Sequence, residues 1–261
     1  MQNNNLGKLS LNFLLIFIRP IITVLFRVKF IDPSNEARNE SPKLIIANNS
    51  SPLTMLFLML YLPNNPVATY FKAESKSIAQ RILILFFEVI EIDILDLKST
   101  KKVIDAIAKG RSVVFLPEGP LVTGRTIGKI YESVGFIAAQ TNVKITPIAI
   151  NGLHRSSILS PKNTERQILF PQVTLKILPT KFTPPITKEN ISKQRKLSTK
   201  FIRTIMLEIY FDIGNFEGTL FDALLNSSKL HGAGTKIMSD ITGDEMSYRQ
   251  VILRSFLLSK L

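Results

Sequence analysis

The sequence predicts an α/β fold class, with a mixed or mostly parallel sheet flanked by helices. Short apolar runs rich in Val and Ile alternate with helical patterns from residue 43 to residue 178, which is the order expected of successive βα units. Turn signals containing Pro, Gly, Asn and Ser separate these segments. With 261 residues the chain is long enough for one large core and a small appendage.

Each expected element follows from its own pattern. The turn Asn48-Asn49-Ser50-Ser51-Pro52 ends the first strand and supplies caps to the next helix, and Gly110 closes a later helix. Pro147 predicts that its strand lies at a sheet edge or starts after the proline, because proline cannot donate to the hydrogen-bond ladder. The expected strands are residues 43–47, 67–71, 89–94, 112–116, 144–150 and 173–178, and the expected helices are residues 53–61, 77–87, 99–109, 129–140 and 197–211.

The N-terminal segment is hydrophobic but interrupted. Residues 9–26 are almost wholly apolar, yet Arg19-Pro20 lies near their middle, and a transmembrane helix needs about 18–20 uninterrupted apolar residues. The pattern favours two short helices hinged at Pro20 and lying in one leaflet, with Arg19, Arg27 and Lys29 near the headgroups. A buried helical hairpin is the alternative. The Asn-rich start and the lack of an Ala-x-Ala site disfavour a cleaved signal peptide.

Three domains are predicted from these shifts in pattern. Residues 179–200, rich in Lys, Pro and Thr, predict a solvated connection, and the tail carries two helical patterns, at residues 220–226 and 246–258. The predicted domains are residues 1–33 as hydrophobic membrane-associating helices, residues 34–212 as the α/β domain, and residues 213–261 as a helical tail.

Composition limits the function classes. A net charge of +13, with the basic excess mainly in residues 41–212, suits an anionic membrane surface or an acidic protein partner. Nucleic acid is disfavoured, because no basic stripe interleaved with aromatic residues is present and there are 5 Tyr to stack bases. With no Cys and only two His, neither a thiolate nor a multi-histidine metal site is expected, and no cofactor is predicted.

A carboxylate at a strand end marks the first candidate site. The buried strand 112–116 is stopped by Pro117-Glu118-Gly119-Pro120. Ligands of open α/β sheets bind in the crevice beyond the carboxyl ends of strands, so this turn is a plausible floor for a binding site. An ordinary solvated turn is the alternative interpretation.

The order of several motifs resembles the glycerophosphate and lysophospholipid acyltransferase family over residues 43–178. The motifs are the Asn-rich turn, Phe71-Lys72-Ala73-Glu74, Pro117-Glu118-Gly119, Gly135-Phe136 and the strand with Thr146-Pro147-Ile148. A closer resemblance is to the acyltransferase half of bacterial bifunctional acyl-carrier-protein synthetase/2-acylglycerophosphoethanolamine acyltransferases. The segments that carry it are residues 110–119, Lys129-Ile130-Tyr131, residues 135–139, residues 169–179, Thr219-Leu220-Phe221 and Gly232-Ala233-Gly234. That resemblance implies that the tail corresponds to the start of the linker to an adenylating half, which is absent from this sequence.

The resemblance implies a catalytic block in which a His after an Asn is followed by a Ser and an Asp. The His would remove the proton from a glycerol hydroxyl, and the Asp would orient the imidazole. Here Asn49 stands in the position of the His and Thr54 in that of the Asp. An amide cannot accept a proton near neutral pH and a hydroxyl carries no charge, so both catalytic roles are vacated. His154 is a candidate replacement base, with a solvated loop histidine as the alternative.

The same resemblance implies that the acceptor's glycerophosphate is bound around the Pro-Glu-Gly turn. In the family a basic residue follows this turn, whereas here Pro120 does, so Arg125 or Lys129 would have to supply the cation. The implied substrate-binding residues are Ser51, Pro117, Glu118, Gly119, Arg125 and Lys129.

The sequence thus predicts a phospholipid or glycerol acyltransferase-family protein whose ancestral reaction moved an acyl chain to a lysophospholipid, with lost or very weak activity. The alternatives are a non-catalytic lipid- or acyl-binding protein and a fragment of a decayed bifunctional enzyme. Expected partners are membrane phospholipid or lysophospholipid and an acyl donor such as acyl-carrier protein, whose acidity would complement the basic core. The expected location is the cytoplasmic face of a bacterial inner membrane.

Overall fold

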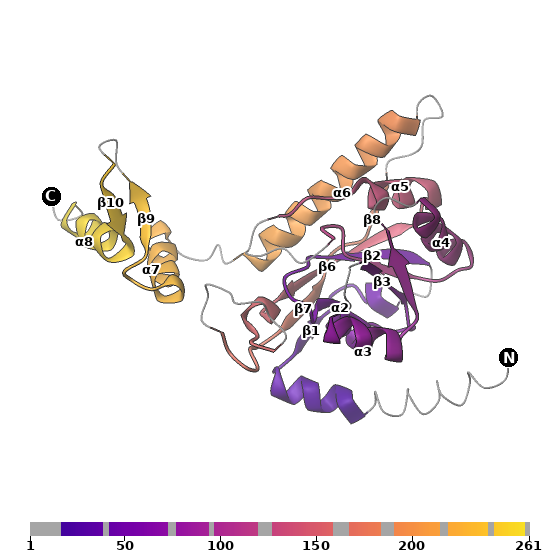
Figure 1. The fold of residues 1–261 in the computed structure, drawn as a ribbon, viewed down its shortest axis with the longest axis horizontal. Coiled ribbons are helices and arrows are strands. Elements are labelled where there is room, and N and C mark those ends of the chain that lie inside the picture. The colour runs from indigo at the N-terminus through magenta and orange to yellow at the C-terminus, as the bar shows by residue number, and fades with distance from the viewer. Residues whose placement is uncertain are drawn as a thin grey trace.

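The computed structural model describes the chain in nine stretches, which comprise an α/β body and a small C-terminal unit (Figure 1). The described residues are 17–38, 42–72, 77–93, 97–119, 127–158, 167–183, 191–214, 219–239 and 243–258. Within them, no helix is both long and apolar enough to cross a bilayer.

The body is built on one eight-stranded sheet of order β1-β7-β6-β2-β5-β3-β4, with β8 pairing to β6. Strands β6, β2, β5, β3 and β4 are mutually parallel, β7 and β8 are antiparallel to β6, and β1 is parallel to β7. The strands are β1 Lys29–Ile31, β2 Lys43–Ala47, β3 Val67–Phe71, β4 Val89–Ile92, β5 Val113–Phe115, β6 Lys144–Asn151, β7 Thr174–Ile177 and β8 Lys181–Phe182. The prediction of an α/β fold with a mixed, mostly parallel sheet is therefore confirmed.

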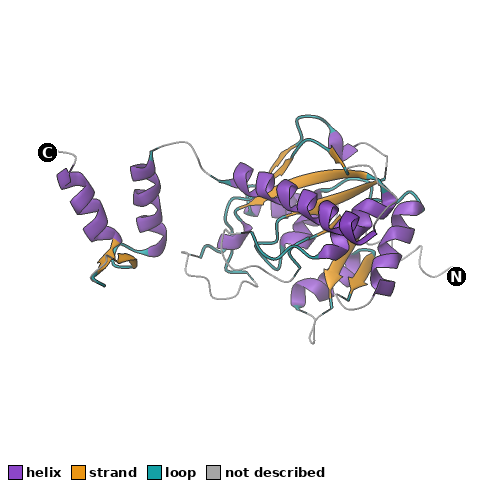
Figure 2. Cartoon of the chain, turned by 90° about the horizontal axis from the view of Figure 1, so that it is seen from above, coloured by secondary structure: helices purple, strands orange, loops and turns teal. Residues whose placement is uncertain are grey.

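Helices cover both faces of the sheet, as Figures 1 and 2 show. A helix over residues 17–25, α2 (Thr54–Tyr61) and α3 (Ile78–Phe86) pack on one face. Helices α4 (Leu97–Ala108), α5 (Glu132–Thr141) and α6 (Ile191–Ile213) pack on the other. Alternate residues of the central strands therefore enter two separate cores: Ile45 faces the first group of helices, and Leu44 faces the second.

Pro147 is inside a central strand, so the prediction of an edge position is wrong. Strand β6 lies between β2 on one side and two shorter strands on the other. On that other side, β7 pairs with residues 148–151 and β8 pairs with residues 144–145, so residues 146–147 face a gap between β7 and β8. The carbonyl of Pro147 accepts from the N–H of Leu178 at 2.9 Å. The N–H and C=O of one strand residue point to the same side, so the missing N–H of Pro147 faces this break and costs the ladder little.

Other boundaries also differ from the predictions. Helix α5 begins at Glu132 rather than at residue 129, and α6 begins at Ile191, inside the expected solvated connection. The short strands β1 and β8 were not predicted, because two or three residues carry too little periodicity to be recognised. The N-terminal helix runs through Pro20 without a break, so the predicted hinge is not found; residues 1–16 lie outside the described part.

The C-terminal unit is a pair of helices around a β-hairpin. It consists of α7 (Leu220–His231), β9 (Lys236–Ser239), β10 (Glu245–Ser247) and α8 (Tyr248–Leu258). Thr219 caps α7 in a reciprocal pair of hydrogen bonds with Asp222, and these bonds lower the pKa of the Asp222 carboxyl. Both predicted helices are present, whereas the hairpin between them was not foreseen.

Candidate functional site

The carboxyl ends of three neighbouring parallel strands meet at one edge of the sheet. Strand β2 lies between β5 and β6, so the Asn-rich turn after β2, the Pro-Glu-Gly turn after β5 and the segment after β6 lie together. The Asn48 side chain, fully buried, donates to the Ile150 carbonyl at 2.9 Å and accepts from the Ile150 N–H at 2.9 Å. Its amide thus acts as an additional peptide group that extends the β2–β6 ladder.

Glu118 is a buried hydrogen-bond centre that joins three segments. Its side chain accepts from the backbone N–H of Asn49 at 3.1 Å and from that of Gly128 at 2.7 Å. The Tyr210 hydroxyl, from α6, donates to the same carboxylate, at 2.9 and 3.0 Å from its two oxygens. Burial, and then the negative charge of Glu118, raise the pKa of Tyr210. With 3% of its surface exposed, Glu118 fixes the floor of the site rather than facing solvent.

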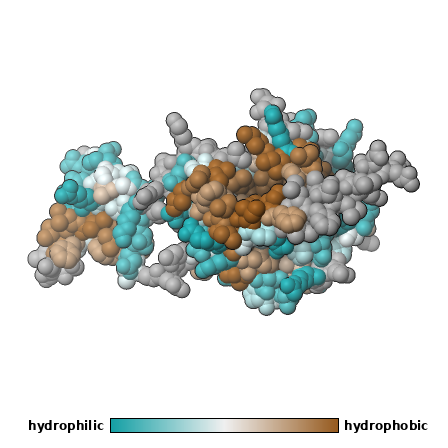
Figure 3. All heavy atoms as spheres, turned by 90° about the horizontal axis from the view of Figure 1, so that it is seen from below, coloured by the Kyte–Doolittle hydropathy of each residue, from teal (hydrophilic) through white to brown (hydrophobic). Residues whose placement is uncertain are grey.

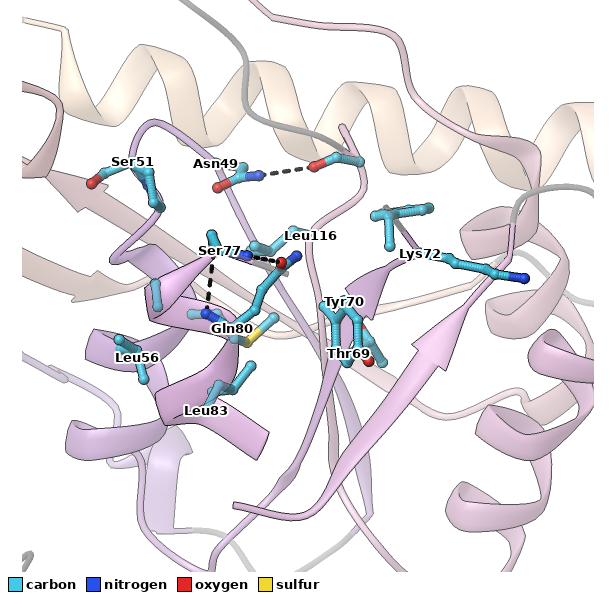
Figure 4. A pocket seen from close by; sticks show the side chains of 15 residues that line it. Asn49, Ser51, Leu56, Thr69, Tyr70, Lys72, Ser77, Gln80, Leu83 and Leu116 are labelled. Carbon is cyan, nitrogen blue, oxygen red and sulfur yellow. Dashed lines mark hydrogen bonds between the residues drawn. The ribbon is translucent and has the colours of Figure 1, made fainter. Parts of the chain in front are cut away.

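Asn49 lies at the centre of the site and is oriented by the turn after β5. Its side-chain amide donates to the Gly119 carbonyl at 2.8 Å, the bond drawn in Figure 4. Gly119 has a φ of +72°, and a Cβ there would lie 2.4 Å from the Tyr131 ring, so both the turn and the packing require glycine. The amide of Asn49 is therefore held in one orientation as a hydrogen-bond donor.

Thr54 and Ser51 satisfy the backbone at the start of α2. The Ser51 N–H donates to the Thr54 hydroxyl oxygen at 3.2 Å, and the Leu53 N–H donates to the Ser51 hydroxyl oxygen at 3.2 Å. Thr54 is fully buried, whereas Ser51 also lines the neighbouring cavity. Both hydroxyls thus accept from backbone N–H groups of the turn. The predicted side-chain cap of the helix is not found, because the N-cap of α2 is Leu53 and has no side-chain hydrogen bond.

A cavity of about 310 Å³ opens beside Asn49 (Figure 4). Its walls come from the turn after β2, from α2, β3 and α3, and from the end of β5. Its lining contains no His, Asp or Glu among the residues that the structure describes, and Lys72 is its one cation within that part of the chain. Lys72 points away from the cavity in Figure 4, with its ammonium 3.5 Å from the Asp93 carboxylate.

The structure gathers only some of the predicted site residues around this cavity. Asn49, Ser51 and Gly119 line it, and Glu118 is bonded to Asn49 behind it. Pro117 is buried, and Lys129 is exposed, 5.5 Å from the centre of the Tyr131 ring; neither lines the cavity. Arg125 and Pro120 lie outside the described residues.

His154 lies at the same sheet edge but does not line the cavity. It belongs to a 3₁₀ turn, Leu153–Arg155, directly after β6, and it is 7% exposed. The prediction of a solvated loop histidine is therefore wrong, because the turn packs into the body instead of protruding.

Sequence reasoning missed half of the cavity wall. Thr69 and Tyr70 of β3, and Ser77 and Gln80 at the start of α3, line the side opposite Asn49. These lining residues could have been predicted from the polar residues at the end of β3, since the carboxyl ends of strands in such sheets face the ligand crevice. Among the described residues, no three His, Asp or Glu side chains are grouped closely enough to hold a metal ion.

Comparison with known proteins agrees with this geometry. The family model described as Acyltransferase matches residues 27–151, which contain β2 to β6, the Asn-rich turn and the Pro-Glu-Gly turn. The matched residues make up just under half of the 261-residue chain. The crystal structure of the 1-acyl-sn-glycerophosphate (LPA) acyltransferase PlsC from Thermotoga maritima has the same fold, with a TM-score of 0.55 and 18% sequence identity over 80% of this chain and 84% of that one.

The matched residues include the turns after β2 and β5 and the end of β6, which lie together at the site. Helix α6, which supplies Tyr210, follows the matched residues and closes the site from outside them. The chain thus combines a fold like that of PlsC with a cavity that is lined by the amide of Asn49.

Proposed function

We propose that this protein is a phospholipid or glycerol acyltransferase-family member that binds lysophospholipid or acyl chains and has lost all or nearly all acyl transfer. The observation that carries the proposal is the hydrogen bond from the Asn49 amide to the Gly119 carbonyl. It occupies the central position of the site with a group that cannot accept a proton near neutral pH.

Acyl transfer to an alcohol needs a group that accepts the hydroxyl proton as the oxygen attacks the thioester carbonyl and the thiol leaves. No carboxylate or imidazole of the described chain lines the cavity to do so. Loss of a general base costs about 10²- to 10⁴-fold in rate, and loss of its partner adds to this. Thr54 cannot replace the partner, because its hydroxyl is neutral and is engaged by the Ser51 N–H.

The chain retains space for an acyl chain. A second cavity, of about 330 Å³, has a wholly apolar lining from the N-terminal helix, α2 and α3. Leu56 lines both cavities, so this apolar space adjoins the cavity beside Asn49. Each methylene buried there would contribute about 0.8 kcal/mol. This supports lipid binding that does not depend on turnover.

The proposed function also includes association with a membrane and an acidic acyl donor. The N-terminal helix exposes Phe17, Ile21, Val24 and Leu25, which we call the N-terminal apolar face. We propose that this face lies on the cytoplasmic face of a bacterial inner membrane. Figure 3 shows hydrophobic residues gathered on one side of the α/β body. The net charge of +13 favours an acidic acyl donor such as acyl-carrier protein. Descent from the bifunctional enzymes belongs to the same proposal and is supported by the tail motifs around Thr219 and Gly232.

The decisive experiment restores the missing pair with Asn49→His and Thr54→Asp together. We expect the wild type to give no phosphatidylethanolamine from lysophosphatidylethanolamine and acyl-carrier-protein thioester above a no-enzyme control, and the double variant to give product. Thr54→Asp alone should lower the melting temperature, because it buries a carboxylate without a cation, and the imidazolium of the double variant should restore part of this loss.

The matched control is Asn49→Gln, which keeps the amide and should remain inactive. Product from the wild type that disappears in Asn49→Ala would overturn the proposed loss of catalysis. A wild type whose melting temperature does not rise with lysophospholipid would overturn the retained lipid binding.

A further inference from the structure

A polar cavity lies beside the N-terminal helix, apart from the site at Asn49. It encloses about 390 Å³, and its lining includes Arg19 of that helix, Arg38 after the 3₁₀ turn Glu36–Arg38, and Asp32. The aromatic residues Phe30 and Tyr61 form further walls. Two exposed arginines thus line one open cavity from different segments of the chain.

The one carboxylate in this lining is engaged by backbone groups. Asp32 accepts from the N–H of Glu36 at 3.0 Å through one oxygen and from the N–H of Ala37 at 3.0 Å through the other. It therefore satisfies two backbone N–H groups at the start of the 3₁₀ turn. Within the part of the chain that the structure describes, neither Arg19 nor Arg38 forms an ion pair. The lining carries two positive charges and one negative charge, which suits a singly charged anion.

Arg19 is held in a defined orientation. Its guanidinium carbon lies 5.2 Å from the centre of the Tyr61 ring. The Thr23 hydroxyl donates to the Arg19 carbonyl at 2.7 Å, so the Tyr61 hydroxyl must donate to Thr23, at 2.7 Å. This chain of contacts fixes the N-terminal helix against α2. A guanidinium stacked on a ring still presents its N–H edge to an anion, which a phosphate oxygen pair can accept in bidentate fashion.

The cavity adjoins the surface that would meet lipid. Arg19 lies on the same helix as the N-terminal apolar face, in which Val24 is 76% exposed and Phe17 66% exposed. Phe30, a wall of the cavity, is itself partly exposed. Figure 3 shows hydrophobic residues gathered on this side of the α/β body. A headgroup bound between the arginines would leave its acyl chains next to this apolar face.

We propose that the Arg19–Arg38 cavity binds the phosphodiester of an anionic membrane phospholipid and thereby selects the membrane surface on which the protein docks. This rests on the membrane association included in the proposed function. The site is distinct from the one at Asn49, so the lipid bound here is a docking ligand and not an acyl acceptor.

The test uses the double variant Arg19→Lys with Arg38→Lys. This variant keeps both positive charges and removes the two planar guanidinium groups. Flotation would be measured with vesicles of phosphatidylcholine alone and of phosphatidylcholine mixed with phosphatidylglycerol. We expect the double variant to partition to the mixed vesicles about five-fold less than the wild type, since lysine cannot reproduce bidentate contacts. Partition to pure phosphatidylcholine should be unchanged. Arg81→Lys, on the exposed side of α3 and outside the cavity, is the matched control and should behave as the wild type.

Equal flotation of the double variant and the wild type with the mixed vesicles would overturn the proposal. Binding to these vesicles would then be explained by the net positive charge of the protein and not by contacts at this cavity. A second measurement tests whether the site binds free phosphate instead of a lipid headgroup. The melting temperature is measured with inorganic phosphate and with chloride at the same ionic strength. If phosphate raises the melting temperature of the wild type but not of the double variant, while mixed vesicles do not distinguish them, the site takes free phosphate and the lipid assignment is wrong. The response to lysophospholipid should be the same in both proteins, so its absence would count against the proposed function alone.

Discussion

Glu118 shows how one buried side chain can support a site without facing its ligand. Two backbone N–H groups and the Tyr210 hydroxyl donate to its carboxylate, so its oxygens are used in holding three loops and helices together. A carboxylate at a strand end was expected to contact substrate. In the fold its contacts are internal, and the polar groups left for a ligand come from Asn49 and from β3 and α3.

The Tyr210 hydroxyl tests this role directly. Tyr210→Phe removes a donor to a buried carboxylate, and we expect it to lower the free energy of unfolding by about 1.5–3 kcal/mol near neutral pH. Urea unfolding would measure the loss. Phe211→Tyr, on an exposed position of the same helix, controls for changes in α6 and should be nearly neutral.

The same variant predicts a dependence on pH. The pKa of Tyr210 is raised in the folded state above its ordinary value near 10, so the folded protein keeps this proton while the unfolded chain loses it. The stability that the hydroxyl contributes is fully present below about pH 10 and falls as the pH rises further. The difference between wild type and Tyr210→Phe should therefore be constant from pH 7 to about pH 9 and shrink above about pH 10. A constant difference at every pH would contradict the assignment.

At the scale of elements, the packing of α5 on α6 depends on Gly135. A Cβ at this position would lie 2.5 Å from the Thr199 hydroxyl oxygen, 2.6 Å from its backbone nitrogen and 2.9 Å from its Cα, so rotation of the side chain alone cannot relieve the clash. The two helices also contact through Arg195, whose guanidinium lies 5.2 Å from the centre of the Phe136 ring. The Gly135-Phe136 pair of the family resemblance is thus explained by a close approach of helices.

Gly135→Ala should therefore destabilise the body by about 1–3 kcal/mol, the usual cost of overpacking. Thermal unfolding followed by circular dichroism would measure it. Gly234→Ala is the control, because a Cβ there meets nothing within 4 Å, and it should change stability little. An unchanged melting temperature for Gly135→Ala would mean that α6 can move away from α5.

At the scale of the whole molecule, the body and the C-terminal unit are separate packing units. The principal contacts of the C-terminal unit are internal, between α7 and α8 and between α8 and β10. Its helix α8 exposes Leu253, Phe256, Leu257 and Leu258. The body has its own two cores, one on each face of the sheet.

A chain ending at Gly214 should therefore keep the body folded. We expect its melting temperature to change by less than about 2 °C, which for a body of this size corresponds to less than about 1 kcal/mol. A chain ending at residue 190 is the matched comparison. It removes Ile202, Ile205, Met206 and Ile209, all buried in one core, and should not fold stably. A large loss of stability in the longer chain would instead assign the C-terminal unit to the body.

The alternation of patterns in the sequence predicted the strands β2 and β3 to the residue, and predicted α2 to α4 and β4 to β7 to within a few residues. Predictions from the sequence pattern were wrong where contacts between distant segments decide the conformation of a residue. Pro147 is tolerated because β7 and β8 break opposite it, and His154 is buried because its turn packs on the body. A two-residue strand such as β8 exists only through its pairing to β6.

The sequence by itself determined the fold class and the residue types at the Asn-rich turn, since hydrophobic period and residue type are local properties: neither the Asn49 amide nor the Thr54 hydroxyl titrates near neutral pH in any conformation. Only the tertiary structure decided where the remaining polar groups lie. It assigned Glu118 to the interior and opened the cavity between α2, α3 and β3. It also brought Arg19 and Arg38 to one cavity. These are contacts between segments distant in the chain, and their geometry depends on how helices pack across a twisted sheet.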